Sequence, residues 1–236
     1  MKALRTVSSR PPLLVVIDGP AGSGKSVITR RLAKALGVPF LYTGAMYRAV
    51  TLIALRRQVR LTDGPALVRI ARSLDIRFRT GKDGRVRVLV GGRDATTALN
   101  HPDISRLTSG HVANEPKVRE ALVERQRRYM TGRGLVAEGR DCASVVFPRA
   151  PYKFYLTASF AERVRRRFAD LRKAGVAVEL KRIRLDMARR DREDRGRATG
   201  ALKVMPDAWV VDNTRMRQEE TIAAMLRRIR GKCSTA

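Results

Sequence analysis

Cysteine and histidine are scarce in this sequence of 236 residues, which contains two of each. Cys142 and Cys233 do not form a CxxC pair, and only His101 and His111 could join them in holding a metal. This pattern argues against a disulfide framework and against a zinc site. Few cysteines without a pairing pattern favour a cytoplasmic protein.

Long apolar segments are missing as well. A membrane-spanning helix needs about 20 consecutive apolar residues, and no run here approaches that length. The longest early run, Leu13–Ile17, is too short for the core of a signal peptide. We therefore expect neither a membrane partner nor secretion. Residues 1–12, which are basic and carry paired serines and prolines, are predicted to form a disordered leader.

Acidic residues are the third shortage. The 22 Asp and Glu stand against 50 Lys and Arg, which gives a formal net charge of +28. A basic surface can bind the phosphate backbone of nucleic acid. It can also be the solvated surface of an arginine-rich protein, and some arginines can instead hold small phosphorylated substrates. Net charge alone leaves these three interpretations open.

What is present begins with a strand, a loop and a helix. Leu13–Asp18 is a continuous apolar run that ends in an acid, and it predicts a buried strand of a parallel sheet. After a glycine-rich turn, Lys25–Leu36 has the apolar spacing of an amphipathic helix that ends at Gly37. With a short second strand at Pro39–Thr43, these elements begin a βαβ unit.

The remaining chain alternates strands and helices around one different segment. Asp75–Arg79 and Arg85–Val90 alternate polar and apolar residues, which predicts an antiparallel hairpin across Thr80–Gly84. Further strands are expected at 135–138, 152–157 and 209–212, and helices at 45–56, 116–130, 160–173 (capped by Ser159), 179–190 and 218–230. We predict an open, doubly wound α/β fold with about five parallel strands and an inserted subdomain that contains a small antiparallel sheet.

The glycine-rich turn matches the phosphate-binding pattern G-x-x-x-x-G-K-[ST]. Its glycines let backbone N–H groups turn toward phosphate oxygens, and the helix that follows points its positive end at them. Lys25 is expected to reach the β- and γ-phosphates of ATP, and Ser26 to ligate Mg²⁺. The residues predicted to bind ATP are Gly19, Pro20, Ala21, Gly22, Ser23, Gly24, Lys25, Ser26 and Val27.

This loop does not name the reaction, because GTPases, ATPases and small-molecule kinases share it. The Asn-Lys-x-Asp element that reads guanine in GTPases is absent from the sequence. Glu138 and Asp212 end strands, but neither follows the long apolar run typical of the carboxylates in motor ATPases. The alternatives are a small-molecule kinase, a basic ATPase that binds nucleic acid, and a protein that binds nucleotides without catalysis.

A family resemblance rests on four blocks: Ile17–Ser26; Tyr42–Arg48; Glu138–Asp141 continuing through Val145–Pro148; and Arg190–Arg197. Their order and spacing resemble those of bacterial cytidylate kinases, in the P-loop nucleoside monophosphate kinase superfamily. The third block is the most diagnostic, because Gly-Arg-Asp followed by Val-Phe-Pro is not a general P-loop feature. The resemblance runs from about residue 13 to residue 230 and implies Mg²⁺-dependent transfer of the γ-phosphate of ATP to CMP or dCMP.

The resemblance also implies how the chain is divided. Within one kinase domain, residues 13–236, it implies a core of 13–43, 131–158 and 205–232, an acceptor-binding insert at about 44–130, and an arginine-rich helical lid at about 159–204. The implied catalytic residues are Lys25, Arg140 and Arg197. The implied acceptor-binding residues are Thr43, Tyr47, Arg48, Gly110, Arg119, Arg140, Asp141, Arg190 and Asp194.

These residue types suit their implied roles. A guanidinium such as that of Arg48 can hold a phosphate through two hydrogen bonds. Arg119 can satisfy the two acceptors of cytosine, and Asp141 can accept from its amine. The blander alternatives are that Tyr47 is a core aromatic and that the basic helix with Arg163–Arg167 is a solvated face rather than a source of donor-side arginine.

The clearest departure from the family lies just before the 116–130 helix. The family has a serine that contacts the base where this chain has Gly110, with Ser109 beside it. Either Ser109 moves in, or a water replaces the hydroxyl, or base discrimination is looser. Cys142 replaces a common Met, and Ala201 a common Pro. The family also suggests a monomer that binds small nucleotides and no specific nucleic acid.

Overall fold

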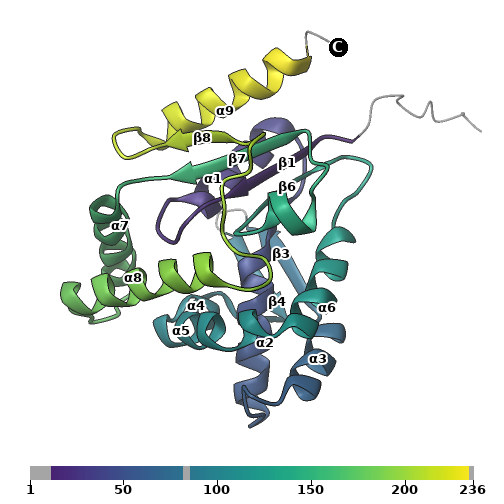
Figure 1. Cartoon of the computed structure of the whole chain (residues 1–236), viewed down its shortest axis with the longest axis vertical. Coiled ribbons are helices and arrows are strands. Elements are labelled where there is room, and N and C mark those ends of the chain that lie inside the picture. Colours follow the sequence, from purple (N-terminus) through teal and green to yellow (C-terminus); the bar gives the residue numbers. More distant parts are fainter. Residues whose placement is uncertain (1–11, 82–85, 234–236) are drawn as a thin grey trace, which may run out of the picture.

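A parallel sheet of five strands lies at the centre of the computed structural model, which describes residues 12–81 and 86–233 (Figure 1). The strands stand in the order β2-β6-β1-β7-β8, and each neighbouring pair is parallel. Their bounds are Leu14–Asp18 (β1), Phe40–Tyr42 (β2), Leu135–Gly139 (β6), Tyr152–Thr157 (β7) and Trp209–Asp212 (β8). The predicted α/β class and five-stranded parallel sheet are confirmed.

Both faces of the sheet are covered. Successive side chains of a strand point to opposite faces, and in β1 Val15 and Ile17 pack with α1 (Lys25–Leu36) and α9 (Gln218–Cys233). Val16 packs on the other face, in a cluster with the helices between β2 and β6. The continuous apolar run of this strand is therefore explained by burial on both sides.

The strand order brings two strand ends together. β1 lies between β6 and β7, so that Ile17 is opposite Glu138 and Asp18 is opposite Gly139. In open α/β sheets ligands bind outside the carboxyl ends of the strands, where the order of connections reverses. Here the glycine-rich loop follows β1 and the Gly139–Asp141 block follows β6 at this same edge.

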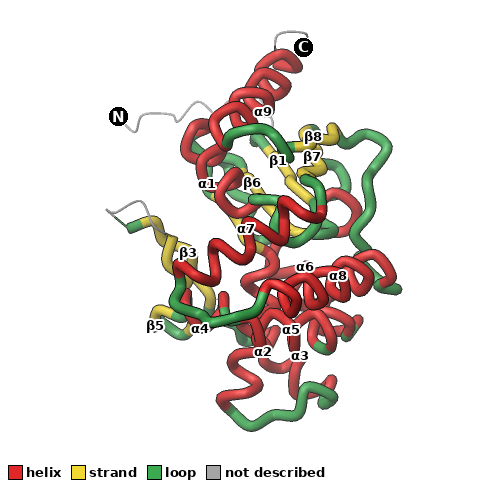
Figure 2. Tube along the Cα trace, turned by 90° about the vertical axis from the view of Figure 1, so that its left-hand side faces the viewer, coloured by secondary structure: helices red, strands yellow, loops and turns green. Residues whose placement is uncertain are grey.

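The chain between β2 and β6 forms a second, mostly helical part, opposite α9 in Figure 2. It contains α2 (Thr43–Arg56), α3 (Gly64–Arg72), β3 (Ile76–Thr80), β4 (Val86–Val90), β5 (Arg93–Asp94), α4 (Thr96–Asn100), α5 (Pro102–Gly110), a 3₁₀ turn (Val112–Asn114) and α6 (Pro116–Arg127). The antiparallel hairpin is confirmed, with Phe78 opposite Val88. Residues 82–84 of its expected turn, residue 85 of its expected second strand and residues 1–11 of the expected leader lie outside the described residues.

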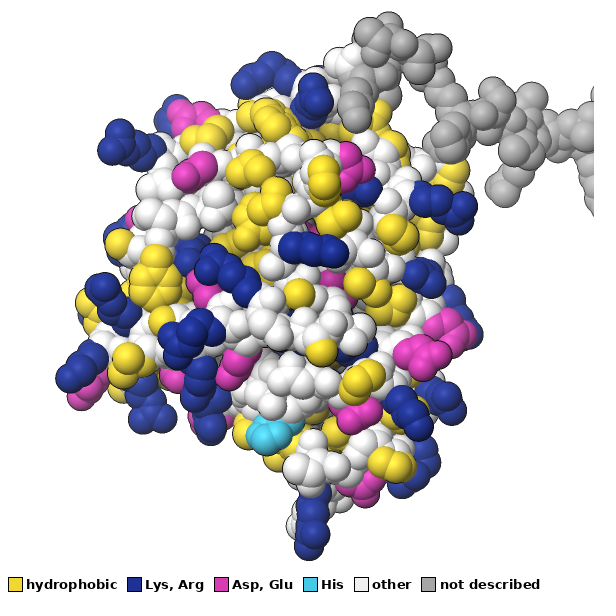
Figure 3. Space-filling view, in the orientation of Figure 1, with side chains coloured by type: hydrophobic (Ala, Val, Ile, Leu, Met, Phe, Trp, Pro, Cys, Tyr) yellow, Lys and Arg dark blue, Asp and Glu magenta, His cyan; other side chains and the backbone are white. Residues whose placement is uncertain are grey.

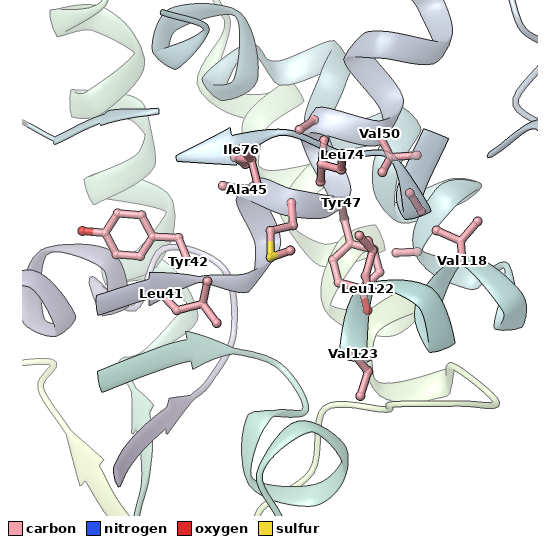
Figure 4. Close-up of a cluster of buried hydrophobic side chains, with 14 of the residues drawn as sticks. Leu41, Tyr42, Ala45, Tyr47, Val50, Leu74, Ile76, Val118, Leu122 and Val123 are labelled. Atoms are coloured by element: carbon pink, nitrogen blue, oxygen red, sulfur yellow. The ribbon is translucent and has the colours of Figure 1, made fainter. Parts of the chain in front are cut away.

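Several elements of this part were not predicted. β5 has only two residues and pairs with β4, so it carries no periodic pattern of its own. Helix α3 is short, and it begins where the Asp63 side chain accepts from Ala66 N at 2.9 Å. The core of this part joins α2 to α6, and Figure 4 shows Tyr47 lying beside Leu122. Tyr47 is thus a core residue as well as a candidate site residue.

Two basic helices follow β7. Helix α7 (Phe160–Lys173) begins as predicted, because Ser159 Oγ accepts from Glu162 N at 3.3 Å. Helix α8 (Leu180–Gly196) continues six residues beyond the predicted end at Arg190. The extension is stabilised by buried Asp191 and Asp194, which pair with arginines of other elements. The arginine-rich block is therefore helical up to Gly196. In the described part of the chain, none of the helices has the length and apolarity needed to cross a membrane.

Candidate active site

The glycine-rich loop joins β1 to α1 and turns tightly against α7. Gly22 has a φ of 76°, and a Cβ built on it would lie 2.8 Å from the carbonyl oxygen of Arg163. Only glycine fits this close approach. The sequence pattern, the preceding buried strand and the following helix define the chain as a P-loop protein.

Lys25 is folded back onto this loop. Its Nζ donates to the Pro20 carbonyl at 2.8 Å and lies 3.4 Å from Ser23 Oγ. Burial, together with the nearby charge of Arg140, lowers the pKa of Lys25 to about 7. A buried ammonium of low pKa lacks a strong counter-charge, and a phosphate can supply one.

Arginines of α7 support the loop from outside. Arg163 Nη1 donates to the Ala21 carbonyl at 3.0 Å, and its Nη2 donates to Asp191 at 2.7 Å. Arg166 donates to Asn213 Oδ1 at 3.0 Å, and Asn213 Nδ2 donates to the Ser23 carbonyl at 3.0 Å. At least two residues of the basic helix therefore fix the shape of the phosphate loop rather than forming a merely solvated face.

Glu138 was not predicted as a site residue, yet its carboxylate meets the phosphate loop. Ser26 Oγ donates to Glu138 Oε1 at 3.1 Å, and the Tyr42 hydroxyl donates to the Ser26 carbonyl at 2.9 Å. All of β6 is buried, although its apolar run is only three residues long. The signal that could have found Glu138 is its position directly before the Gly139–Asp141 block.

Asp18, at the end of β1, is a structural anchor. Its carboxylate accepts from the backbone N–H of Cys142 at 3.0 Å and of Ala143 at 2.8 Å, at the start of a π-helical turn (Cys142–Val146). Burial raises the pKa of Asp18 to about 6. By holding this turn, Asp18 fixes the position of the neighbouring Asp141.

Arg119 and Asp141 form a buried ion pair. Their side chains are 4% and 5% exposed. Arg119 Nη1 also donates to the Ala113 carbonyl at 3.1 Å, and its guanidinium lies 5.3 Å from the centre of the Tyr47 ring. Burial raises the pKa of Asp141. The two predicted base-reading residues, which come from α6 and from the turn after β6, are thus brought together.

A second buried cluster surrounds Asp194. Its carboxylate accepts from Arg140 Nε at 2.6 Å and from Arg197 Nη2 at 2.9 Å, and Arg190 Nε lies 4.0 Å away. Burial opposes ionisation, but Arg140, Arg190 and Arg197 hold the pKa of Asp194 well below its usual range. One carboxylate therefore organises three arginines.

This cluster has more positive than negative charge. Burial and neighbouring arginines lower the pKa values of Arg48 and Arg190 to about 10. The Nε atoms of both are buried, with no hydrogen-bond partner among the described residues. Burying positively charged hydrogen-bond donors without partners is unfavourable for the free energy of folding. An anion such as phosphate would accept their hydrogen bonds.

One cleft collects nearly all of these groups. It is lined by the predicted residues Ala21, Gly22, Gly24, Lys25, Ser26, Val27, Thr43, Tyr47, Arg48, Arg119, Arg140, Asp141, Arg190, Asp194 and Arg197. Gly19, Pro20 and Ser23 belong to the loop behind it. Gly110 does not line the cleft, whereas Ser109 does, and the Ser109 hydroxyl donates to Glu193 of α8.

Comparison with known proteins agrees with this site. The family model described as cytidylate kinase matches residues 15–231. A cytidylate kinase of Symbiobacterium thermophilum is 40% identical over 218 residues, covering 92% of this chain and 96% of the relative. A cytidylate kinase of Saccharophagus degradans is 43% identical over 209 residues, covering 88% of this chain and 92% of the relative. One from a Shewanella species is 40% identical over 231 residues, covering 98% of this chain and 100% of the relative. The chain belongs to the cytidylate kinase family, and it is a kinase with a nucleotide substrate.

Proposed function

We propose that the enzyme transfers the γ-phosphate of ATP to CMP or dCMP, giving ADP and CDP or dCDP. The observation that carries this proposal is the single cleft that joins three groups. The three groups are the P-loop with Lys25, the cluster of arginines around Asp194, and the Arg119–Asp141 ion pair. These groups suit a donor triphosphate, an acceptor phosphate and a cytosine base.

The proposed reaction needs positioning and positive charge more than a base. The acceptor oxygen of a nucleoside monophosphate is already ionised, and charge in the transition state spreads over the oxygens of the moving phosphoryl group. Lys25, Arg140 and Arg197 are placed to follow that charge. Arg48 and Arg190 would hold the acceptor phosphate, and closure of α7 and α8 over the cleft would exclude water.

The cleft also suits Mg²⁺. Ser26 offers a hydroxyl and Glu138 a carboxylate, and Mg²⁺ prefers few protein oxygens together with waters and substrate phosphates. Bound there with ATP, the ion would neutralise charge on the β- and γ-phosphates. Ser26 would be the direct ligand, and Glu138 would orient Ser26 or a metal-bound water.

Glu138→Gln should raise the Mg²⁺ concentration needed for half-maximal turnover about tenfold, because partners that orient a metal ligand contribute about 10–100-fold in affinity. Turnover against Mg²⁺ concentration, at fixed ATP and CMP, measures this. Glu124→Gln, which changes an exposed carboxylate of α6, is the matched control. A wild-type Mg²⁺ dependence for Glu138→Gln would rule out its role at the metal.

Nucleotide binding should be accompanied by proton uptake. The pKa of Lys25 is about 7 in the free protein, so about half of the molecules are neutral there at pH 7 and about nine-tenths at pH 8. Phosphates beside Nζ raise this pKa, so binding takes up a proton, and affinity falls as pH rises above about 7. Titration calorimetry of Mg–ATP binding in buffers of different ionisation enthalpy measures the uptake. Lys25→Arg stays charged and should lose the uptake, and equal uptake by both proteins would contradict this role.

The identity of the acceptor is tested by measuring the rate of ADP release with CMP, dCMP, UMP or AMP as the second substrate. We expect CMP and dCMP to be used, with UMP and AMP far behind, because a site that hydrogen-bonds the cytosine amine leaves buried groups unpaired with other bases. Turnover with none of the four would exclude the proposal.

We further propose that residues 44–130 and 159–204 move toward a fixed core during turnover. The two parts touch each other across the cleft, through Ser109 with Glu193 and Arg197 Nε with Asn114 Oδ1 at 3.0 Å, and we interpret this arrangement as the closed state. Small-angle scattering with and without both nucleotides should show a smaller particle when they are bound. The proposed setting is a cytoplasmic monomer acting on small nucleotides rather than on nucleic acid.

A further inference from the structure

The segment after α8, which we call the strap (residues 197–202), connects the two buried clusters of the cleft. It leaves α8 at Gly196 and leads toward β8 (Figure 1). Leu202 N donates to the Asp194 backbone carbonyl at 2.7 Å, and the Leu202 side chain is buried. The strap is thereby fixed to the residue that organises the phosphate-binding arginines.

Within the strap, Gly200 lies directly against the base-reading pair. Its φ is 70°, a left-handed conformation that favours glycine. A Cβ built on Gly200 would lie 2.5 Å from Asp141 Oδ2 and 2.6 Å from Arg119 Cζ, and closer still to Arg119 Nη2. Contacts this short cannot exist, so a side chain at position 200 must displace the pair or the strap.

The pair has few directions in which to move. Arg119 is held by the Ala113 carbonyl and lies against the Tyr47 ring, and both charged side chains are almost fully buried. The strap is held through Leu202. The open space beside Arg119 and Asp141 is the cleft that both of them line, and Gly200 is not among its lining residues. A methyl group at position 200 would therefore push the pair into the space for the base.

We propose that Gly200 is a positioning residue for base recognition: the bare backbone at position 200 sets how far Arg119 and Asp141 project into the cleft. This inference rests on the proposed function, and it adds a specificity determinant from the strap to residues that touch the base. Its consequence is that affinity for the acceptor and selectivity for cytosine depend on a residue that contacts neither substrate.

The test compares Gly200→Ala with Gly37→Ala. Gly37 has a φ of 69° and no neighbour within 4 Å of an added Cβ, so it reproduces the backbone strain without the collision. For Gly200→Ala we expect the KM for CMP to rise on the order of tenfold, the size typical of overpacking a filled site. The CMP-to-UMP ratio of kcat/KM should fall as well, while the KM for ATP stays within about twofold.

A double-mutant cycle separates positioning from general damage. In an Arg119→Ala background the collision with the guanidinium is gone and only that with Asp141 Oδ2 remains, so the effect of Gly200→Ala on the CMP dissociation constant should become clearly smaller than in the wild-type background. If Gly200→Ala unfolds, Gly200→Asn keeps the Cβ with less strain at positive φ and serves in its place. The inference is overturned if the position-200 variant matches Gly37→Ala in KM and selectivity, or if its effect is unchanged without Arg119. A wild-type enzyme that does not use CMP would instead overturn the proposed function.

Discussion

Lys25→Ala should lower kcat at least about a thousandfold, in the range known for removing a cation that stabilises the transferred phosphoryl group. The protein should stay folded, because the Lys25 ammonium is buried without a strong counter-charge and the folded protein already disfavours its charge. Steady-state turnover of CMP gives the first quantity, and thermal unfolding gives the second.

Lys34→Ala is the matched control, since Lys34 lies exposed in the last turn of the same helix. Lys34→Ala also removes a lysine side chain from α1, but it leaves the phosphate loop unchanged. Turnover should therefore stay near the wild-type value. A Lys25→Ala variant that keeps more than a tenth of normal turnover would contradict the role of the P-loop. An equal loss from both variants would show that the effect comes from the helix.

Asp141→Asn should reduce the preference for CMP over UMP about a hundredfold. The carboxylate of Asp141 accepts from the cytosine amine in the proposed complex, whereas an amide can rotate and donate to the uracil oxygen instead. The measured quantity is the ratio of kcat/KM values for the two acceptors, which cancels any loss of folded protein. The Tm should also fall, because Arg119 loses its buried counter-charge.

Asp103→Asn provides the comparison for this second variant. Asp103 lies on α5, and its side chain is 56% exposed. Removing its charge should leave both the ratio and the Tm near wild-type values. An unchanged ratio for Asp141→Asn would show that base selection resides elsewhere in the cleft.

The sequence predicted the parts of the fold that depend on local pattern. The P-loop, the strand and the helix that flank it, and the Ser159 cap all depend on residues within a few positions of each other. The strand order could not be read in this way, because β1 meets β6 across more than a hundred residues. Strand β5 was missed because two residues carry no period, and the end of α8 was missed because its last turns are held by Arg140 and Arg163 from other elements.

The sequence predicted which residues line the cleft better than it predicted the contacts between them. Arg140, Arg197 and Asp194 were named through the family resemblance, but the sharing of one carboxylate by several arginines appears only in three dimensions. Glu138 was recognised as an acid at the end of a strand, and its contact with Ser26 requires the neighbouring strands. Gly200 has no signal in the sequence, since its importance comes from packing against Arg119 of a different helix.

Part of the high positive charge belongs to arginines that line the cleft. Among the described residues, the buried carboxylates are Asp18, Glu138, Asp141, Asp191 and Asp194, and they lie in or beside the cleft. Their charges are therefore removed from the surface, and Figure 3 shows Lys and Arg side chains scattered over the face in view, mainly around its rim, among hydrophobic and other side chains. In the proposed complex Arg48, Arg140, Arg190 and Arg197 would hold phosphates, which is one of the three interpretations of the net charge.

The most direct test of the proposed function follows the phosphoryl group itself. ATP labelled at its γ-phosphate is incubated with the enzyme, Mg²⁺ and CMP, and the labelled products are separated. We predict that label appears in CDP at the rate at which ADP forms, with little in inorganic phosphate. Label found only in inorganic phosphate, or label that remains in ATP, would contradict the claim that this cleft transfers phosphate to CMP.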